Sequence, residues 1–206
     1  MSTATIEPTP AQPIDLSTTP RIPLSRLVRV ELRKLANTRS GKWLLITISV
    51  ITLFVIGIFY LTAKHSDRTF FNFMAATNGP QGLLLPVLGI LLITSEWSQR
   101  TALVSFTLMP VRSRLLLAKV LAGLLAGLAA IALTVVVAAL ATLVGGAGNA
   151  WARFGVDDLG KFGLLQATGV LQGLAFGLLL LNSSAAIVSY FVLPTALNIV
   201  AMLWTP

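Results

Sequence analysis

Residues 164–203 read LLQATGVLQGLAFGLLLLNSSAAIVSYFVLPTALNIVAML and contain no charged side chain. One helix of about forty residues would be about 60 Å long, which is twice the thickness of the hydrocarbon core of a bilayer. The polar triplet Asn182, Ser183 and Ser184 lies near the middle of this stretch. The sequence therefore predicts two membrane spans, at about 163–181 and 185–204, that are joined by a tight turn.

The composition of the whole chain agrees with a membrane protein. Hydrophobic residues make up 55% of the 206 residues and charged residues only 11%, whereas soluble domains carry about 25% charged residues. A net charge of +8 is also found in nucleic-acid-binding proteins, but Lys and Arg accumulate on the cytoplasmic loops of membrane proteins. Because so few charges are available to build a basic face, we expect topology to explain the excess, and we expect no nucleic-acid partner.

The chain offers little material for catalysis or for metal binding. It has no cysteine, and no cluster of His, Asp or Glu at metal-ligand spacing surrounds its single histidine, His65. Residues 155–161 fit the first part of a phosphate loop, but Phe162 replaces the Ser or Thr that holds magnesium, and two aspartates would repel phosphate. We therefore expect no catalytic residue, no metal and no cofactor in this chain.

The rest of the chain divides into a tail, an amphipathic helix and three further spans. Residues 1–20 are rich in Pro, Thr and Ser and are predicted to be disordered. The helix is predicted within residues 21–42, and residues 43–206 form a transmembrane domain. Its first three spans are predicted at about 43–63, 70–95 and 115–144. The fold class is therefore an all-α polytopic membrane bundle with five spans in this chain.

The second of these spans contains a strong helix breaker, Asn78-Gly79-Pro80. Either the helix begins before Asn78 and is kinked at Pro80 and Pro86, or a re-entrant segment precedes a short helix. The sequence leaves both alternatives open.

The helix predicted within residues 21–42 has one apolar and one basic side. The apolar side carries Leu24, Leu27, Val28, Leu32 and Leu35, and the opposite side carries Arg26, Arg29 and Arg33 with Lys34 on the flank. This pattern suits the cytoplasmic surface of an anionic bilayer. Glu31 lies within the apolar stripe and therefore needs a partner. That partner is either Lys34, three residues on, or a group on another loop or chain.

The distribution of positive charge predicts the orientation. With the N-terminus in the cytoplasm, eleven of the 15 Lys and Arg residues fall on inside segments and four fall on outside loops. The inside residues are Arg21, Arg26, Arg29, Arg33, Lys34, Arg39, Lys42, Arg100, Arg112, Arg114 and Lys119, and the outside residues are Lys64, Arg68, Arg153 and Lys161. Five spans then place the end of the chain at the outer face.

A short amphipathic segment is predicted between the second and third spans. Glu96 and Arg100 are spaced i, i+4, so they can pair on a helix. The apolar stripe that follows consists of Ala102, Leu103, Phe106 and Met109, and Pro110 ends it before a basic run. Such a segment either lies on the bilayer or docks into a partner protein, and these residues alone do not decide between the two.

Small and polar residues recur within the predicted spans. The glycines that share helical faces are Gly123, Gly127, Gly169, Gly173 and Gly177. We expect them to serve packing within the chain rather than a dimer interface. The polar residues Gln166, Gln172 and Asn198 are expected to form interhelical hydrogen bonds rather than substrate contacts. Both groups are also candidates for lining a substrate pathway.

The order of these features resembles that of ABC-2-type ABC transporter permeases. The resemblance rests on residues 96–119 with their Arg100-Thr101 pair, on the amphipathic helix with Glu31 and Lys34, and on LLLLNSSAAIVSYFVLPTALNIV in the last hairpin. It covers nearly everything after residue 20, and its style is that of actinobacterial drug or antibiotic exporters. Family members usually have six spans and carry Gly before the threonine, whereas this chain has five predicted spans and Arg100 at that position.

The resemblance implies a permease subunit in a bacterial plasma membrane that exports a hydrophobic drug, antibiotic or lipid-like substrate. It implies a dimer with a second copy or a homologous permease, and a separate ATPase subunit that binds ATP and Mg. The loop helix would be a coupling helix seated in a groove of that ATPase. The interface residues implied are Glu96, Arg100, Thr101, Leu103, Phe106, Met109, Pro110 and Arg112, with Glu31, Arg33 and Lys34 on the interface helix.

Two other classes of function are weighed against the permease. A noncatalytic membrane scaffold or regulator would dock a cytoplasmic protein through the same loop. An intramembrane enzyme would need paired acids, a His cluster or a Ser/Lys pair at membrane depth, and the predicted spans carry none of these. A co-purifying ATPase subunit would distinguish the permease from the scaffold.

Overall fold

The computed structural model describes residues 22–98, 112–152 and 154–204, and every regular element in these ranges is helical. The elements are α1 (Leu24–Asn37), α2 (Arg39–Thr62), the short 3₁₀ helix η1 (His65–Asp67), α3 (Phe70–Ser98), α5 (Arg112–Gly145), α6 (Val156–Leu180) and α7 (Ser183–Trp204). Five of them, α2, α3, α5, α6 and α7, are long and apolar enough to cross a membrane. The all-α class and the five long apolar helices are thus confirmed.

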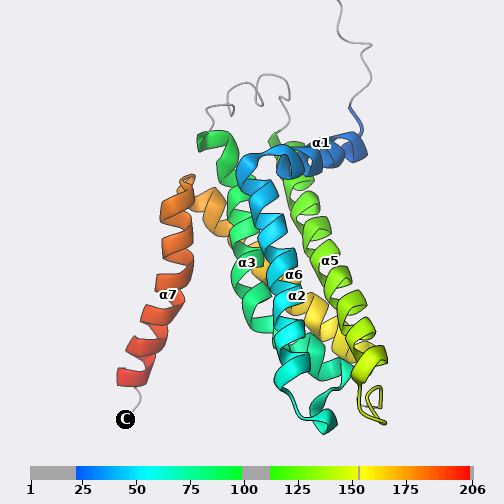
Figure 1. Ribbon diagram of the computed structural model, residues 1–206. Coiled ribbons are helices and arrows are strands. Elements are labelled where there is room, and N and C mark those ends of the chain that lie inside the picture. The colour runs from blue at the N-terminus through cyan, green and yellow to red at the C-terminus, as the bar shows by residue number, and fades with distance from the viewer. Residues whose placement is uncertain (1–21, 99–111, 153, 205–206) are drawn as a thin grey trace, which may run out of the picture.

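The long helices run between two ends of a bundle, and α1 lies across one of these ends (Figure 1). We call this end the α1 end; it also holds the starts of α2 and α5 and the end of α3. The opposite end holds η1, the connection between α5 and α6, and the last turn of α7. Helix α3 contacts α2, α5, α6 and α7, so it is the central helix of the bundle.

Helix α3 is continuous through both of its prolines. Pro80 and Pro86 lie inside the helix, which begins at Phe70. The alternative in which the helix begins before Asn78 is therefore correct, and the re-entrant segment is wrong. Prolines are tolerated inside apolar helices when neighbouring helices support the backbone. Helix α6 packs closely against α3 at this point, because Gly173 lies directly against the backbone carbonyl of Pro86.

The glycines of the predicted small faces lie at helix interfaces within the chain. A Cβ atom at Gly123 or Gly127 would lie 3.2 or 3.3 Å from the side chain of Val170, so these two glycines bring α5 close to α6. On α6, Gly169 and Gly173 face Pro86, and Gly177 faces Ile90. The small faces therefore hold α6 tightly against α3 and α5, as interior packing predicts.

The last two helices form the predicted hairpin. Only Leu181 and Asn182 separate α6 from α7, and Leu181 makes the turn with a left-handed backbone, φ 51°. Its N–H donates to the carbonyl of Gly177 and thereby closes α6. Helix α6 begins at Val156, seven residues before the predicted start of the span at 163. Helix α7 packs loosely, since Ala186 is its one buried residue.

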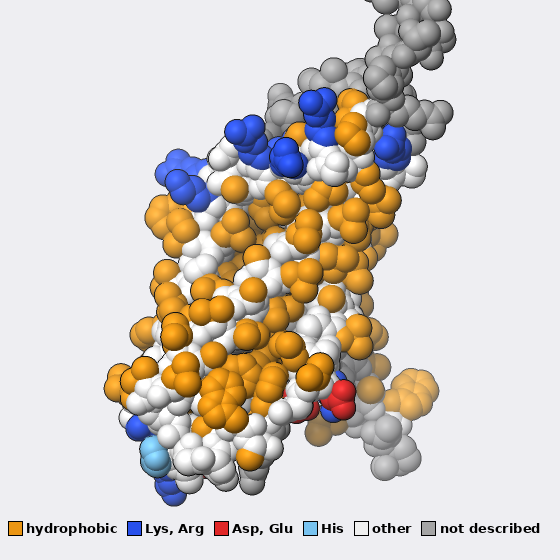
Figure 2. All heavy atoms as spheres, turned by 90° about the vertical axis from the view of Figure 1, so that its right-hand side faces the viewer, with side chains coloured by type: hydrophobic (Ala, Val, Ile, Leu, Met, Phe, Trp, Pro, Cys, Tyr) orange, Lys and Arg blue, Asp and Glu red, His pale blue; other side chains and the backbone are white. Residues whose placement is uncertain are grey.

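The outer surface of the bundle is apolar between its two ends. Figure 2 shows hydrophobic side chains over the middle of the molecule and a row of Lys and Arg side chains at the α1 end. Many of the exposed large side chains on the long helices are aliphatic or aromatic, including Phe54, Leu143, Leu179 and Leu203. A surface of this kind is stable in lipid and would be an aggregation liability in water.

Candidate functional site

Helix α1 rests on the bundle through the stripe that its sequence predicts. Leu27, Glu31 and Leu35 are buried at successive i, i+4 positions. Arg26, Arg29 and Arg33 are exposed on the opposite side. Glu31 is only 2% exposed although its side chain is a carboxylate. A carboxylate in that position requires compensating charge from the bundle below.

Four charged side chains meet beneath α1, and we call them the charge cluster: Glu31, Lys34, Glu96 and Lys119. The Nζ atom of Lys34 lies 2.8 Å from Glu31 Oε1 and 2.8 Å from Glu96 Oε1. The Nζ atom of Lys119 lies 2.7 Å from Glu31 Oε2 and 3.2 Å from Glu96 Oε1. The four charges therefore alternate around a closed ring that ties α1 to the end of α3 and to the second turn of α5.

Both interpretations of Glu31 hold. It pairs with Lys34 on its own helix, and it also pairs with Lys119 on another helix, 88 residues away in sequence. The Nζ atom of Lys119 donates in addition to the backbone carbonyl of Leu92, at 3.3 Å. The ammonium of Lys119 thus has three oxygen partners, which matches its three donors.

The cluster is neutral as a whole and largely shielded from solvent. Glu96 and Lys119 are 7% and 6% exposed. Breaking a buried ion pair by removing one partner typically costs about 3–5 kcal/mol, because the other charge stays buried without compensation. The arrangement therefore fixes where the end of α3 sits relative to α1 and α5.

Lys34 is the one member of the cluster with a substantially exposed side chain, at 42%. Burial alone would lower the pKa of Lys34. Hydrogen bonds and charge attraction from Glu31 and Glu96 outweigh the burial, so the pKa of Lys34 is raised above its ordinary value. Lys34 is therefore a stable cation at every physiological pH.

A cavity of about 260 Å³ lies beside the cluster at the α1 end. Its walls come from α3, α5 and α6 and include Trp97, Arg112, Leu116 and Leu178. Glu96 and Lys119 also line it, so the charge cluster forms part of its wall. Glu96 and Trp97 near the end of α3 and Arg112 at the start of α5 thus lie together around this cavity.

Several of the predicted interface residues lie outside the described residues. They are Arg100, Thr101, Leu103, Phe106, Met109 and Pro110. The predicted pair between Glu96 and Arg100 is therefore untested, and the described contacts of Glu96 are with Lys34 and Lys119. Arg112 begins α5, and Arg33 is exposed on the basic side of α1. The structure thus brings Glu31, Lys34 and Glu96 together and places Arg33 apart.

Polar side chains also meet in the middle of the bundle. Gln166 of α6 is 1% exposed and donates to Asn78 Oδ1 of α3 at 3.2 Å, as interhelical bonding predicts. A second group joins three helices: Gln81 Nε2 donates to Thr52 Oγ1 at 3.1 Å and to Thr134 Oγ1 at 2.6 Å. Sequence analysis missed this second group.

The other two polar residues of the predicted pathway are not interior. Gln172 on α6 and Asn198 on α7 are both exposed. Their surroundings in the described residues therefore differ from the interhelical role expected of them. Gln166 is the only one of the three that forms an interhelical hydrogen bond within the described residues.

The segment that resembles a phosphate loop is instead the beginning of a helix. Gly155 is the N-cap of α6, and the residues that follow it are helical from Val156 onward. The carboxylate of Asp158 accepts a hydrogen bond from the N–H of Gly155 at 3.2 Å. The backbone N–H groups from Val156 onward therefore belong to a helix rather than to the extended loop of a phosphate-binding motif.

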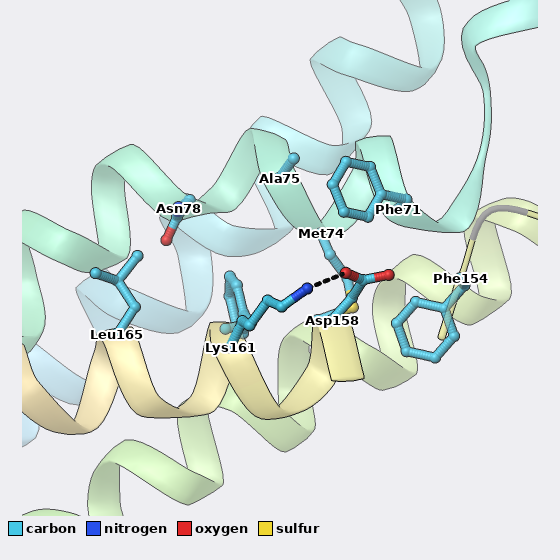
Figure 3. A pocket seen from close by; sticks show the side chains of 9 residues that line it. Phe71, Met74, Ala75, Asn78, Phe154, Asp158, Lys161 and Leu165 are labelled. Atoms are coloured by element: carbon cyan, nitrogen blue, oxygen red, sulfur yellow. Dashed lines mark ion pairs between the residues drawn. The ribbon is translucent and has the colours of Figure 1, made fainter. Parts of the chain in front are cut away.

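A groove that the sequence analysis missed lies at the opposite end, between α3 and α6 (Figure 3). Its apolar wall includes Phe71, Met74 and Leu165, and its polar residues are Asn78, Asp158 and Lys161. The i, i+3 and i+7 spacing of Asp158, Lys161 and Leu165 places them on one helical face, which is a visible signal. The matching face of α3 becomes apparent only once the two helices are seen to pack.

No protein-family model matches this chain, and comparisons with curated proteins and with solved structures gave no match either. Within the described residues, no group of three or more His, Asp or Glu side chains is placed to hold a metal ion. The function is therefore argued from the charge cluster and from the sequence pattern of residues 99–111, which follow α3 in the chain.

Proposed function

We propose that this chain is the membrane-spanning permease subunit of an ABC transporter of the ABC-2 type. It exports a hydrophobic drug, antibiotic or lipid-like substrate from a bacterial cell, using ATP that a separate ATPase subunit hydrolyses. It acts as a dimer with a second copy or with a homologous permease. The chain supplies the path through the membrane and contains no catalytic residue of its own.

The charge cluster is the observation that supports this proposal most directly. A permease must convert the movement of a docked partner into movement of its helices. Glu96 lies just before the segment 99–111 and is bonded to Lys34 of α1 and to Lys119 of α5. A force on that segment is therefore transmitted to two other elements through ion pairs, at a point where a buried charge cannot be left uncompensated.

The proposal includes a cytoplasmic α1 end and an external opposite end. Arg26, Arg29 and Arg33 of α1 are exposed, and α1 lies across the α1 end, where these side chains suit an anionic inner leaflet. Because the chain has no cysteine, a Ser40→Cys and an Asn149→Cys variant each carry a single thiol at an exposed position. In whole cells, a membrane-impermeant thiol reagent should label only the Asn149→Cys variant. If only the Ser40→Cys variant is labelled, the α1 end is external and the proposed orientation is wrong.

The proposed docking of segment 99–111 onto a partner is tested at Phe106, the large aromatic residue of the apolar stripe predicted there. A Phe106→Ala substitution should weaken partner binding by about 2 kcal/mol or more, as expected of an interface anchor. Phe106→Asp should abolish binding because it adds a charge to a desolvated contact. The control is Ser105→Asp, which adds the same charge to the neighbouring position outside the stripe and should leave binding nearly unchanged.

The measurement is photolabelling with azido-ATP of proteins that co-purify with each tagged variant, together with the membrane yield of that variant. A labelled partner should accompany the unmodified chain and the Ser105→Asp variant, and it should be absent with Phe106→Asp at normal yield. Full recovery of the partner with Phe106→Asp would contradict the docking role. A stable partner that does not bind ATP would instead favour the scaffold.

A further inference from the structure

The groove between α3 and α6 has a volume of about 230 Å³ and lies at the opposite end of the bundle from the charge cluster. Phe71 and Leu165 on its rim are 42% and 56% exposed, so the groove opens outward from the bundle. Met74 and Phe162 form its floor and are 4% and 9% exposed. An apolar hollow of this size loses dispersion contacts unless a hydrocarbon or an aromatic group fills it.

The polar residues of the groove form an electrically balanced pair. Lys161 Nζ lies 3.6 Å from Asp158 Oδ1, and Figure 3 shows the two side chains lying along the same face of α6. The Lys161 side chain is 78% exposed, whereas that of Asp158 is 29% exposed. Asp158 is held in place by its hydrogen bond from the N–H of Gly155. Among the described residues, the groove thus offers one fixed anion and one cation on a flexible stem.

This balance selects against ligands with a single charge. A purely anionic group that is attracted to Lys161 is repelled by the carboxylate of Asp158 a few ångströms away. A purely cationic group is attracted to Asp158 and repelled by Lys161. A zwitterion with an anionic and a cationic group a few atoms apart satisfies both side chains at once. Asn78 Oδ1 already accepts from Gln166, so Asn78 does not alter this charge balance.

The depth of the pair matches that of a lipid headgroup. Lys161 lies five residues after the start of α6, so it is about 8 Å from the end of that helix along its axis. Long cationic side chains at this depth reach toward the polar interface while their stems cover apolar surface. The part of the groove at Leu165 lies deeper than the pair and extends toward the hydrocarbon core, whereas Phe71 lies nearer the end of the bundle.

We propose that this groove binds one zwitterionic phospholipid with an amino headgroup. An acyl chain lies against Met74, Phe162 and Leu165, the phosphate pairs with Lys161, and the ammonium pairs with Asp158. The ion pair between Asp158 and Lys161 opens to admit the headgroup, and its long distance makes that exchange easy. This site belongs to the chain alone and does not depend on the transport function or on any partner.

The test uses tryptophan quenching by brominated lipids in the full chain. The four natural tryptophans are replaced by Phe, and one reporter is introduced as Phe71→Trp in the groove wall. The control reporter is Leu143→Trp, at a 72% exposed position on α5 near the same end of the bundle. Each variant is reconstituted with increasing fractions of brominated phosphatidylethanolamine or of brominated phosphatidylglycerol.

The mole fraction of brominated phosphatidylethanolamine that quenches half of the fluorescence should be about tenfold lower for the groove reporter than for the control reporter. The reason is that charged contacts add to the apolar contacts in the groove. Phosphatidylglycerol should quench both reporters alike. Asp158→Asn and Lys161→Gln should each remove most of the preference at the groove reporter. Equal quenching of the two reporters, or equal quenching of the groove reporter by the two lipids, would overturn the proposal.

Native mass spectrometry of the chain with its natural tryptophans provides a second measurement that needs no reporter. In an equimolar mixture of the two lipids, the unmodified chain should retain one phosphatidylethanolamine in preference to phosphatidylglycerol. The Asp158→Asn variant should lose that preference while it keeps its helical content. Retention of the two lipids in equal amounts by the unmodified chain would also contradict the site.

Discussion

The two ends of this bundle each carry oppositely charged side chains, but in opposite settings. At the α1 end, Glu31, Glu96 and Lys119 are at most 7% exposed, and together with Lys34 they form a ring of four contacts. At the other end, Asp158 and Lys161 form a single contact of 3.6 Å with a mostly exposed lysine. The same chemical groups therefore have different consequences, and burial decides which.

A buried ring of charges holds its members because each charge is compensated by its neighbours in the ring. Its atoms have left water, and each must keep its neighbours to offset that desolvation. An exposed pair exchanges partners at little cost, since solvent or a ligand replaces either member. The charge cluster thus suits a rigid mechanical link, and the Asp158–Lys161 pair suits a binding site.

The largest expected effect comes from removing one member of the charge cluster. Glu31→Leu leaves the two lysines with one carboxylate, and Lys119→Met leaves the two carboxylates with one lysine. Each should lower the free energy of unfolding by about 3–5 kcal/mol. The double variant keeps the neutral pair of Lys34 and Glu96, so its loss should be smaller than that of either single variant. The measurement is unfolding followed by circular dichroism in detergent.

A matched control for these variants lies on the same helix. Arg33→Leu also removes a charge from α1, but Arg33 is exposed and outside the ring. It should change the free energy of unfolding by no more than about 0.5 kcal/mol. If the losses in Glu31→Leu and Lys119→Met simply add in the double variant, the two residues do not act as a pair.

Local patterns in the sequence were sufficient to predict the elements but not their contacts. The wheel of α1 placed Glu31 within the apolar stripe, and that position is indeed buried. Its partner Lys119 is 88 residues away, and no local spacing indicates such a pair. Helix α3 presented the same difficulty, because the close approach of Gly173 to Pro86 is a tertiary contact.

The missed groove has the same physical explanation. Each of its walls is an ordinary helical face, and the cavity exists only where α3 and α6 meet. The sequence analysis assigned Lys161 to an outside loop and treated Asp158 only as a reason to reject a phosphate loop. Helix α6 begins at Val156, which brings both residues onto a helical face that also carries Leu165.

The next largest effect is expected from a close contact between α3 and α6, the two helices that form the groove. A Cβ at Gly173 would collide with the backbone of Pro86, so Gly173→Ala should push α6 away from α3 and cost about 1–3 kcal/mol. The control on the same helix is Gly163→Ala, where a Cβ meets nothing within 4 Å. That substitution should be neutral or should stabilise by about 0.5–1 kcal/mol.

Gly173→Ala also distinguishes the two ends of the molecule. The groove lies between α3 and α6, whereas the charge cluster joins α1, α3 and α5. Lipid quenching at the groove should therefore change in this variant, and the loss caused by Lys119→Met should stay the same when the two substitutions are combined. Strong coupling between Gly173→Ala and Lys119→Met would show that the two ends are not independent.

A smaller effect is expected from pH, and it falls outside the physiological range. The pKa of Lys34 is raised in the folded chain, so its contribution is complete below its unfolded pKa of about 10.4 and is lost as pH rises through the folded value. The difference in unfolding midpoint between the unmodified chain and Lys34→Met should be constant from about pH 7 to 9 and should shrink at higher pH. A difference that shrinks already near neutral pH would show that Lys34 is not held as a cation by the two carboxylates.

The smallest effect on stability is expected at the exposed pair of Asp158 and Lys161, in contrast to the large effect expected at the charge cluster. Lys161→Gln removes the ion pair but leaves the cap that Asp158 provides to Gly155. Since Lys161 is mostly exposed, its loss should change the free energy of unfolding by no more than about 1 kcal/mol. Asp158→Asn keeps an oxygen that accepts the Gly155 N–H, so it should be similarly mild.

Unfolding in a lipid-free detergent gives both values. A loss as large as that of Lys119→Met would mean that the pair is a structural element. A small loss together with a large change in lipid preference would separate binding from stability at this end of the molecule.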